Sequence, residues 1–328
     1  MQRRLAIIGA TGFAIERMIP QILRQKNATI VAIQGRNETE LQRICKEFDI
    51  SGCYTEIEEM LTQSKPNVVY VCTPPYRHRE DLEVVFKHKL PAICEKPLAQ
   101  HLQEAKKIEK LYKKYKSPPF ILGHHMRHQQ AISDIKAFIE SKEIGEAIFV
   151  QGQWGYELDP QSKLAKWKLK KNLGGKSVFG DPGIHIIDLC LALFGKPQSV
   201  LAHGFSVISE ETYDNASCIL EYPKLSISLN NSQTMSAARN DFFIYGTKGR
   251  ISVPGGISQE SISKVEITSP KGSQIKEYPP VDLYANEVDA LFGKESGLPP
   301  TSFKEAMIGM QVLEAIHKSI KTGKKCKI

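Results

Sequence analysis

The feature that most constrains the fold is a regular alternation of short apolar runs and amphipathic segments through the first third of the chain. The apolar runs are rich in β-branched residues, whereas the segments between them repeat their apolar residues at helical spacing. Strands that alternate with helices predict a parallel sheet, and right-handed crossovers make that sheet doubly wound. The predicted strands cover residues 5–9, 28–33, 67–73, 92–94 and 120–123, and the predicted helices cover residues 13–26, 39–48, 79–87 and 102–115.

After residue 123 the pattern changes to strand-like stretches that follow one another with turn residues between them. Successive strands without intervening helices are typical of an antiparallel or mixed sheet. A helix predicted at 132–139 precedes these strands, and a last helix at 304–318 follows them. We therefore predict an α/β protein with two domains, at residues 1–123 and 124–328. The strand-like stretches cover residues 147–156, 199–207, 216–222, 226–230, 242–245 and 265–268.

Composition and charge argue against several classes of protein. No apolar run approaches the ~20 residues that a membrane-spanning helix needs, so we predict no membrane partner. The formal net charge is +8, and lysines cluster on the predicted helix at 102–115. Because no nucleic-acid recognition motif accompanies these lysines, we interpret them as a solvated helix face and predict no nucleic-acid partner.

The cysteines indicate the redox environment. There are seven of them, without any Cys-x-x-Cys pairing, and several lie within apolar runs. We predict that all seven are reduced thiols. Reduced thiols are typical of a reducing compartment, most simply the cytoplasm.

A glycine loop, residues Gly9-Ala10-Thr11-Gly12-Phe13-Ala14, joins the first predicted strand to the first predicted helix. Glycines at such a junction permit a tight turn and close approach of a pyrophosphate, and the helix N-terminus offers free N–H groups to the phosphates. The loop matches the G-x-G-x-x-G/A pattern except that Thr11 replaces the middle glycine. We predict that this loop binds a dinucleotide, with Gly12 allowing the close approach and the Thr11 hydroxyl as a further donor; the alternative is a purely structural loop.

The ends of two strands bear on the choice of cofactor. An acidic residue after the strand at 28–33 would bind the ribose 2′-hydroxyl of NAD, but this chain has Gly35 and Arg36 nearby. Gly35 leaves room, and Arg36 offers a guanidinium to a 2′-phosphate, so we predict that NADP(H) is favoured over NAD(H). The alternative is that Arg36 is an ordinary surface residue. Thr73 and Pro74, at the end of another strand, are further cofactor-binding candidates.

A lysine follows the predicted strand at 92–94, in the sequence Glu95-Lys96-Pro97. A lysine at the wall of a crevice loses hydration, which lowers its pKa and lets it exchange a proton near neutral pH. Lys96 is therefore a candidate catalytic residue, with Glu95 as a candidate ion-pair partner, and Glu95, Lys96 and Pro97 are also candidate cofactor-binding residues. The alternative is an exposed loop lysine.

A second candidate group precedes the apolar stretch 186–194, in the sequence Asp181-Pro182-Gly183-Ile184-His185. Asp at the N-cap and Pro at the first helical position are typical of a helix start, so we predict that Asp181 caps a helix and shares one face with His185 and Asp188. Asp181 would then orient an imidazole whose proton moves in catalysis. The alternatives are a capping aspartate beside a core histidine, or a metal site. We predict no metal, because no cysteine or second histidine lies nearby in sequence.

These two motifs resemble the signature motifs of the glucose-fructose oxidoreductase / inositol dehydrogenase / rhizopine catabolism (Gfo/Idh/MocA) family. The resemblance continues along nearly the whole chain. Its further points are Arg127, the turn at residues 144–146, the hairpin at residues 245–249 and the last helix at residues 314–316.

The resemblance implies an N-terminal Rossmann domain and a C-terminal α/β domain built on a large open, mostly antiparallel sheet, which often forms the oligomer interface. It implies an NAD(P)-dependent dehydrogenase or reductase, in which a hydride moves between nicotinamide and a carbinol or carbonyl carbon of a sugar, cyclitol or sugar derivative. By resemblance Lys96 and His185 handle the proton, Asp181 assists, and Pro97 shapes the wall beside the nicotinamide. The candidate substrate-binding residues are Lys96, Arg127, Trp167, Lys168, Asp181 and His185.

Departures from the family pattern leave alternatives open. Gly175-Lys176-Ser177 stands where a triple glycine is common, and residues 166–171 are unusually basic. A substrate phosphate or carboxylate near Lys168 or Lys176 is one hypothesis, and a solvated loop is the other.

The replacement at Thr11 raises a different alternative, a non-catalytic cofactor-binding sensor or scaffold. The retention of Lys96, Asp181 and His185 favours an active enzyme. A reductase of a non-sugar substrate on the same fold, such as an imine or tetrapyrrole, is a further alternative.

Overall fold

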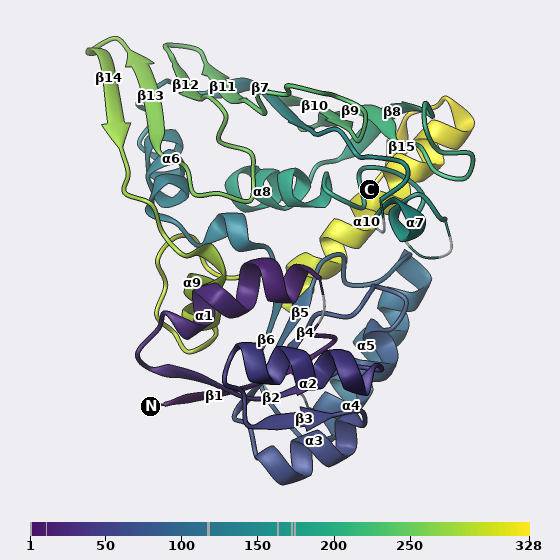
Figure 1. The fold of residues 1–328 in the computed structure, drawn as a ribbon. Helices are drawn as coiled ribbons and strands as arrows, with labels where there is room; N and C mark the ends of the chain where they lie inside the picture. The colour runs from purple at the N-terminus through teal and green to yellow at the C-terminus, as the bar shows by residue number, and fades with distance from the viewer. Residues whose placement is uncertain (1, 11, 117–118, 163, 172, 174) are drawn as a thin grey trace. The chain divides into compact units, whose positions relative to one another are not determined.

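The structure is a computed structural model that describes residues 2–10, 12–116, 119–162, 164–171, 173 and 175–328. Its contacts divide the chain into two compact units (Figure 1). The first unit comprises residues 1–125, 282–295 and 300–307, and the second comprises residues 126–281, 296–299 and 308–328. The chain thus returns to the first unit late in the sequence. The domain bounds at residues 1–123 and 124–328 stay a prediction.

The first unit is built on a six-stranded sheet in the order β3-β2-β1-β4-β5-β6. Every neighbouring pair is parallel, which confirms the predicted doubly wound sheet. Sheets of this kind bind ligands at the carboxyl ends of their strands, where the strand order reverses, here at β1 and β4. The strands are β1 (Arg3–Ile8), β2 (Ala28–Gln34), β3 (Gly52–Tyr54), β4 (Val68–Val71), β5 (Ala92–Glu95) and β6 (Phe120–Gly123).

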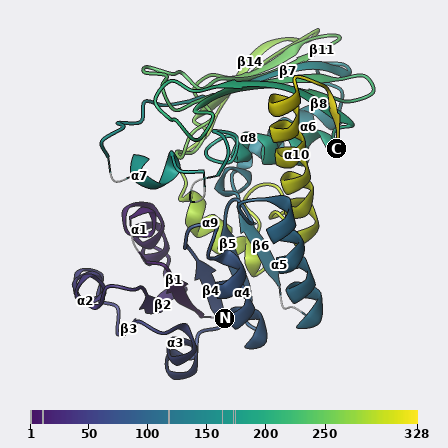
Figure 2. The ribbon, with the colours of Figure 1, turned by 90° about the vertical axis from the view of Figure 1, so that its right-hand side faces the viewer.

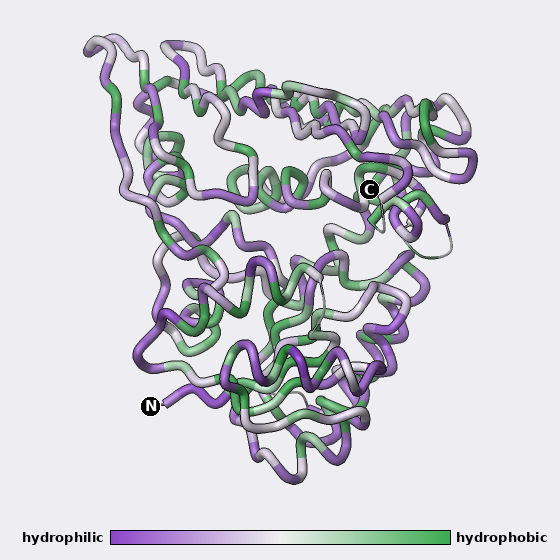
Figure 3. The backbone as a smooth tube through the Cα atoms, in the orientation of Figure 1, coloured by the Kyte–Doolittle hydropathy of each residue, from purple (hydrophilic) through white to green (hydrophobic). Residues whose placement is uncertain are grey.

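Helices surround this sheet (Figure 2). Apolar side chains of α1, α2 and α9 pack with those of β1, β2 and β4 in one buried cluster. The strands supply the apolar centre of the unit, as the hydropathy colouring shows (Figure 3). The helices are α1 (Ile19–Leu23), α2 (Glu38–Glu47), α3 (Ile57–Ser64), α4 (His78–Lys87), α5 (Leu102–Lys114) and α9 (Leu283–Leu291).

The first helix differs from the one predicted at residues 13–26. Residues Ala14–Met18 form a π-helical turn, and α1 then runs from Ile19 only to Leu23. Pro20 lies at the junction of the two. It has no N–H to donate to the carbonyl four residues earlier, so the α-helical ladder is interrupted at this point.

The second unit is built on a nine-stranded sheet in the order β14-β13-β12-β11-β7-β10-β9-β8-β15. β7 and β10 are parallel, and the other neighbouring pairs are antiparallel, which confirms the predicted mostly antiparallel sheet. The strands are β7 (Ala147–Gly155), β8 (Ser199–Phe205), β9 (Asn215–Glu221), β10 (Ser226–Ser232), β11 (Phe242–Gly246), β12 (Arg250–Val253), β13 (Lys264–Ser269), β14 (Gly272–Glu277) and β15 (Cys326–Lys327).

Helices cover one face of the nine-stranded sheet (Figures 1 and 2). Gly152 of β7 lets α8 approach closely, since a Cβ there would lie 3.2 Å from Cδ1 of Ile186 and 3.1 Å from Cδ2 of Leu229. The helices here are α6 (Gln130–Glu140), the short α7 (Ala165–Lys168), α8 (Ile184–Phe194) and the C-terminal part of α10 (Phe303–Thr322), with a 3-10 turn at His125–Arg127. No helix in the described part of the chain is long and apolar enough to cross a membrane.

Several short elements were not predicted from the sequence, namely β3, α3, α7, α9, β12, β14 and β15. β14 shows the physical reason most clearly, because every one of its residues is exposed. A strand without a buried face has no alternation of apolar and polar residues to detect.

One cysteine prediction is wrong. Cys45 and Cys53 form a disulfide that links the end of α2 to β3, with Cα atoms 6.5 Å apart. The pair was missed because only the fold brings these two elements together. The free cysteines are Cys72, Cys94, Cys190, Cys218 and Cys326.

Candidate active site

The glycine loop begins where β1 ends, beside β2 and β4. The N–H groups of Gly9 and Ala10 donate to the Gln34 carbonyl, at 2.9 and 3.2 Å, and fix the loop to the end of β2. Gly9 has φ +81°, and a Cβ there would lie 2.7 Å from Cγ2 of Thr73. The position therefore requires glycine, both for its backbone conformation and for the close approach to Thr73.

The second half of the loop fits a dinucleotide through its backbone. Gly12 has φ +48°, and a Cβ there would meet nothing within 4 Å, so its backbone faces open space that a phosphate can enter. Ala14 is fully buried, and the Phe13 ring packs edge-on against Tyr284, with centroids 5.3 Å apart. Both side chains thus anchor the loop in the unit's core. Thr11 lies outside the described residues.

The residues predicted to select the cofactor lie just after β2. Gly35 is buried, and its N–H donates to the Tyr54 carbonyl at 3.2 Å. A Cβ at Gly35 would lie 3.1 Å from Cδ2 of Leu41, so the chain passes close to α2 here. Arg36 is exposed and has no ion-pair partner among the residues that the structure describes. Its guanidinium is therefore open to an anionic ligand.

A buried network holds the turn that carries Lys96. The Tyr70 hydroxyl lies 3.0 Å from Oε1 of Glu95 and 2.6 Å from Oε2 of Glu287. Burial raises the pKa of Tyr70 well above its usual value, and the two carboxylates add to this effect. The Lys96 N–H donates to Oε2 of Glu95 at 3.2 Å, and the Lys96 side chain is half-buried. The Glu95 carboxylate therefore binds the backbone of this turn, through the Lys96 N–H.

In the second unit, the prediction that Asp181 caps a helix is wrong. α8 begins at Ile184, and its N-cap is Gly183. Residues 177–183 form tight turns instead, and the Gly183 N–H donates to the Val178 carbonyl at 2.9 Å. Asp181 therefore lies before the helix that carries His185, and its carboxylate pairs with the Lys168 ammonium.

Lys168 stands in a polar cluster with Asp181, Tyr156 and Gln233. Its ammonium donates to the Tyr156 hydroxyl at 3.2 Å, and the Gln233 amide donates to that hydroxyl at 3.3 Å and to the Asp181 carbonyl at 3.2 Å. Burial disfavours the charge on Lys168, but Asp181 and Tyr156 outweigh it and raise the pKa of Lys168 above its usual value. The ammonium also lies 5.9 Å from the ring centroid of Trp167. The cluster therefore holds a charged lysine beside Asp181.

His185 lies in the first turn of α8 and is almost fully buried. Its ring stacks on Trp154 of β7, with centroids 5.2 Å apart and an interplanar angle of 29°. One turn along α8, Asp188 accepts two hydrogen bonds from the Arg127 guanidinium, at 2.7 and 2.8 Å. Arg127 and Asp188 are both buried, so this bidentate pair is an internal ion pair of the second unit.

The segment before Asp181 is held by α10. Lys176 lies 3.5 Å from Oε2 of Glu314 and is about a third exposed, and the Ser177 hydroxyl lies 2.9 Å from Nε2 of His317. Both lysines suspected of binding a substrate anion therefore have a carboxylate close by, Asp181 for Lys168 and Glu314 for Lys176.

His317 gives the second unit a dependence on pH. Burial, with a smaller effect of Lys176, lowers the pKa of His317 from 6.5 to about 3. As the pH falls below 6.5, the unfolded chain binds a proton at His317 that the folded chain does not. The contribution of His317 to the free energy of unfolding is therefore complete above pH 6.5 and declines toward pH 3. At pH 5 we expect a loss of about 2 kcal/mol from this residue.

The measurement is urea unfolding between pH 8 and pH 5, followed by tryptophan fluorescence, since Trp154 and Trp167 both lie in the second unit. His317→Gln keeps a partner for Ser177 and should flatten the pH profile. Equal profiles for the variant and the wild type would contradict this account.

Sequence reasoning missed several residues of these networks, namely Tyr70, Tyr156, Gln233, Glu287 and His317. Most of them meet partners more than fifty residues away, as Tyr70 meets Glu287 across 217 residues. Tyr156, which meets Gln233 across 77 residues, also had a local signal, because it lies directly after the strand β7, and side chains at a strand end are natural candidates for a site. Among the described residues, no group of three or more His, Cys, Asp or Glu side chains is placed to hold a metal.

Taken together, the parallel sheet, the glycine loop beside its point of reversal and the lysine turn on a nearby strand define a dinucleotide-binding oxidoreductase. Comparison with known families agrees with this class. Residues 3–124 match the oxidoreductase family with an NAD-binding Rossmann fold, and residues 132–252 match the GFO/IDH/MocA C-terminal domain. The chain therefore belongs to the Gfo/Idh/MocA family of NAD-binding oxidoreductases.

Individual relatives are more distant. The chain is 26% identical over 285 residues to D-apiose dehydrogenase of Rhizobium rhizogenes, which covers 84% of this chain and 78% of that protein. It is 23% identical over 333 residues to 1,5-anhydro-D-fructose reductase of Ensifer adhaerens, covering 99% and 98%. A crystal structure of aldose-aldose oxidoreductase from Caulobacter crescentus is similar over the full length of both chains, with a TM-score of 0.89 at 19% identity, which shows the fold alone.

Proposed function

We propose that this protein transfers a hydride between NADP(H) and a carbinol or carbonyl carbon of a small sugar, cyclitol or sugar derivative. The observation that carries the proposal is the arrangement of one sheet edge. The carboxyl ends of β1, β4 and β5 are neighbours, and they carry the glycine loop, Thr73-Pro74 and Glu95-Lys96-Pro97. The substrate class is supported by the two named relatives, one a dehydrogenase of apiose and the other a reductase of anhydrofructose.

The cofactor, when bound, supplies or accepts the hydride. When an alcohol is oxidised, its O–H proton must leave as the hydride departs from carbon, and an unprotonated side chain would have to accept that proton. We assign that proton to Nζ of Lys96 in the first unit or to the imidazole of His185 in the second, and reduction reverses both transfers. The backbone of Gly12 would hold the pyrophosphate, Gly9 would allow the tight turn beside it, and Pro97 would lie beside the nicotinamide.

Substrate binding falls to Lys96, Arg127, Trp167, Lys168, Asp181 and His185 in this proposal. We assign Arg127 an indirect role, because its guanidinium is engaged with Asp188. Lys168 and Asp181 form an ion pair, and such a pair offers both donors and acceptors to the hydroxyls of a neutral polyol. An anionic substrate would have to compete with a carboxylate at each lysine, so we favour a neutral substrate.

A substrate screen tests this proposal. It would pair neutral sugars and cyclitols with their phosphorylated and carboxylated analogues, and it would follow nicotinamide absorbance. Turnover confined to the anionic analogues would overturn the assignment of a neutral substrate. Turnover of an imine or other non-sugar compound alone would favour the alternative reductase. Cofactor binding without turnover of any compound would favour a sensor or scaffold.

The preference for NADP(H) depends on Arg36. We expect NADPH to bind more tightly than NADH, and Arg36→Ala to weaken NADPH binding by about 10-fold, because a charged hydrogen bond to the 2′-phosphate is worth about 1.5–3 kcal/mol. NADH binding should change little. Nicotinamide fluorescence titrations measure both. Arg43→Ala, at an exposed arginine of α2 paired with Glu40 and Glu47, is the matched control. Tighter binding of NADH by the wild type would contradict the proposal.

The open face of the nine-stranded sheet supports a homo-oligomer. Leu201 of β8 pairs in register with Ile219 of β9, and both side chains are exposed on that face, at 43% and 42%. Phe205, further along β8, is 52% exposed. Apolar residues gathered on one face are typical of an interface between copies.

We expect the wild type to elute in size-exclusion chromatography with light scattering at a multiple of 36.8 kDa. Ile219→Lys should shift the mass to that of the monomer, because it places a charge in the proposed interface. Leu23→Lys is the control, since Leu23 is equally exposed, at 40%, but lies on α1 of the first unit. A monomeric wild type would refute the interface.

We propose the cytoplasm as the location of the protein. The support is that five cysteines are free thiols, as is common in reducing compartments. The disulfide between Cys45 and Cys53 counts against it. Thiol labelling of the protein in its native cells, before and after reduction, decides whether that disulfide persists there.

A further inference from the structure

A fully buried histidine lies between two segments of the proposed cofactor site. His78 is the first residue of α4 and has no exposed surface. Its Nε2 lies 2.7 Å from the carbonyl oxygen of Thr73, which follows β4. Its Nδ1 lies 3.2 Å from the carbonyl oxygen of Leu98, which follows the Glu95-Lys96-Pro97 turn. One imidazole thus contacts the backbone segments that follow two neighbouring strands, β4 and β5.

The distances assign the proton on the ring. Burial lowers the pKa of His78, although the Thr73 and Leu98 carbonyls and the Asp81 carboxylate oppose that effect, so the ring is neutral near pH 7. A neutral imidazole donates one hydrogen bond. The contact to Thr73 is the shorter of the two, so we assign the proton to Nε2, which then donates to the Thr73 carbonyl. The charged neighbour is Asp81 on α4, which in turn binds Arg77, the N-cap residue of that helix.

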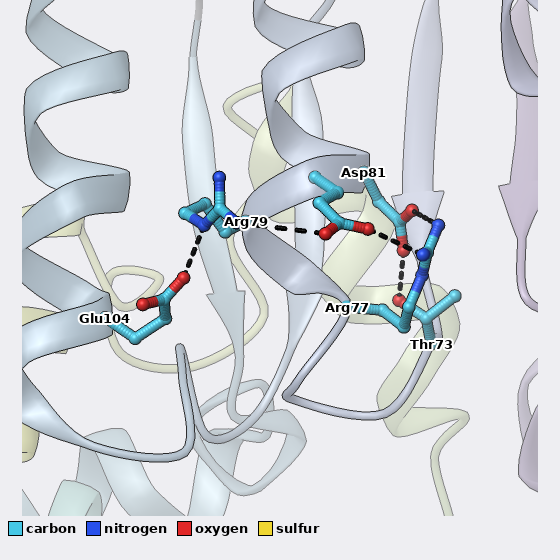
Figure 4. A network of polar contacts seen from close by, with 6 residues as sticks. Thr73, Arg77, Arg79, Asp81 and Glu104 are labelled. Atoms are coloured by element: carbon cyan, nitrogen blue, oxygen red, sulfur yellow. Dashed lines mark hydrogen bonds and ion pairs between the residues drawn. The ribbon is translucent and has the colours of Figure 1, made fainter.

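Thr73 is held from its side chain as well. Its hydroxyl donates to Oδ2 of Asp81 at 2.6 Å, and Arg77 donates to Oδ1 of the same carboxylate at 3.2 Å (Figure 4). Asp81 is almost fully buried. α4 therefore fixes both the carbonyl and the hydroxyl of Thr73, through His78 and Asp81.

A shift of Thr73 would reach the glycine loop directly. The Gly9 backbone packs so tightly on Thr73 that a Cβ at Gly9 would lie 2.7 Å from Cγ2 and 2.9 Å from the nitrogen of Thr73. A substitution at His78 that lets Thr73 move therefore also removes the contact that supports the glycine loop after β1. Nothing in this arrangement requires His78 to touch a ligand.

We propose that His78 is a positioning residue for the oxidoreductase reaction, which holds Thr73 and thereby sets the geometry of the glycine loop and of the strand end beside it. This inference rests on the proposed cofactor site. Its role is distinct from that of Lys96, because His78 acts only through backbone groups. The consequence is that a donor at the position of Nε2 is needed for cofactor binding, whereas a donor at the position of Nδ1 is not.

Two amide variants separate these positions. In His78→Gln the side-chain amide reaches the place of Nε2 and can donate to Thr73, whereas in His78→Asn it reaches only the place of Nδ1. We expect the Gln variant to bind NADPH and NADH within about threefold of the wild type, and the Asn variant to bind about 10-fold more weakly, because the buried Thr73 carbonyl loses its donor. His78→Leu, with no donor, should resemble the Asn variant.

The readouts are cofactor dissociation constants from nicotinamide fluorescence, together with the thermal unfolding midpoint of each variant. His88→Gln is the matched control, because His88 follows the other end of α4 and pairs with Glu58 on the surface.

Equal affinities of the Gln and Asn variants would overturn the inference, as would a loss of thermal stability without any loss of affinity. If the Leu variant does not fold, the comparison of Gln with Asn still decides. If wild-type protein binds neither cofactor, the proposed function fails, and this inference fails with it; wild-type binding with equal affinities in the variants refutes the inference alone.

Discussion

Replacing Lys96 with methionine will lower kcat by about 10²–10⁴-fold, the usual contribution of a positioned acid or base. Methionine keeps the length and apolar stem of the side chain but removes the ammonium that we assign to proton transfer. Because the cofactor is proposed to be held by backbone groups of the glycine loop, its dissociation constant should stay within about threefold of the wild-type value. Steady-state kinetics on a substrate found by the screen, with a fluorescence titration of the cofactor, measure both quantities.

Lys106→Met is the matched control, since Lys106 lies on the exposed face of α5. It should leave both quantities unchanged. Wild-type turnover in the Lys96 variant would remove this lysine from the mechanism and leave His185 as the candidate. A large loss of cofactor affinity with little loss of kcat would instead make Lys96 a binding residue.

Replacing Asp188 with asparagine will lower the free energy of unfolding of the second unit by about 3–5 kcal/mol, the typical cost of breaking a buried ion pair from one side. The substitution keeps the shape of the side chain but leaves the buried Arg127 guanidinium without the carboxylate that it now binds at 2.7 and 2.8 Å. Urea unfolding followed by tryptophan fluorescence reports this change, because both tryptophans lie in the second unit.

The control for this experiment is an exposed ion pair of the same unit. Lys142 and Glu146 lie 2.6 Å apart, and both are solvent-exposed, so Glu146→Gln should have little effect on stability. The double variant Arg127→Met/Asp188→Leu should recover much of the loss, because it buries no unpaired charge. Similar losses in the Asp188 and Glu146 variants would show that the buried pair does not stabilise the unit.

The parts that sequence reasoning predicted are those whose signal is local. The apolar runs that became β1, β2, β4, β5 and β6 each show their strand character within a few residues. The glycine loop was recognisable because Gly9 and Gly12 stand at a strand-to-helix junction, where positive φ angles are needed. The position of Lys96 after a buried strand could likewise be read from one short segment.

The errors lie where a contact from elsewhere in the chain competes with a local preference. Asp181 followed by Pro182 is a normal helix start, but the partly buried Lys168 ammonium binds the carboxylate, and the helix begins at Ile184. The cysteine prediction failed at Cys45 and Cys53 for a different reason, because the turn between α2 and β3 brings together two side chains that are only eight residues apart. Local propensities are weak compared with a charged contact or a covalent bond.

The doubly wound sheet, the family and the candidate chemical groups could be predicted from the sequence, because hydrophobic period and short motifs are properties of neighbouring residues. The contacts of those groups could not, because they depend on the tertiary structure. Tyr70 meets Glu287 across 217 residues, Ser177 meets His317 across 140, and Arg127 meets Asp188 across 61. Such pairs form because burial removes water from polar groups and makes an unsatisfied partner costly, and which groups are buried together depends on the whole fold.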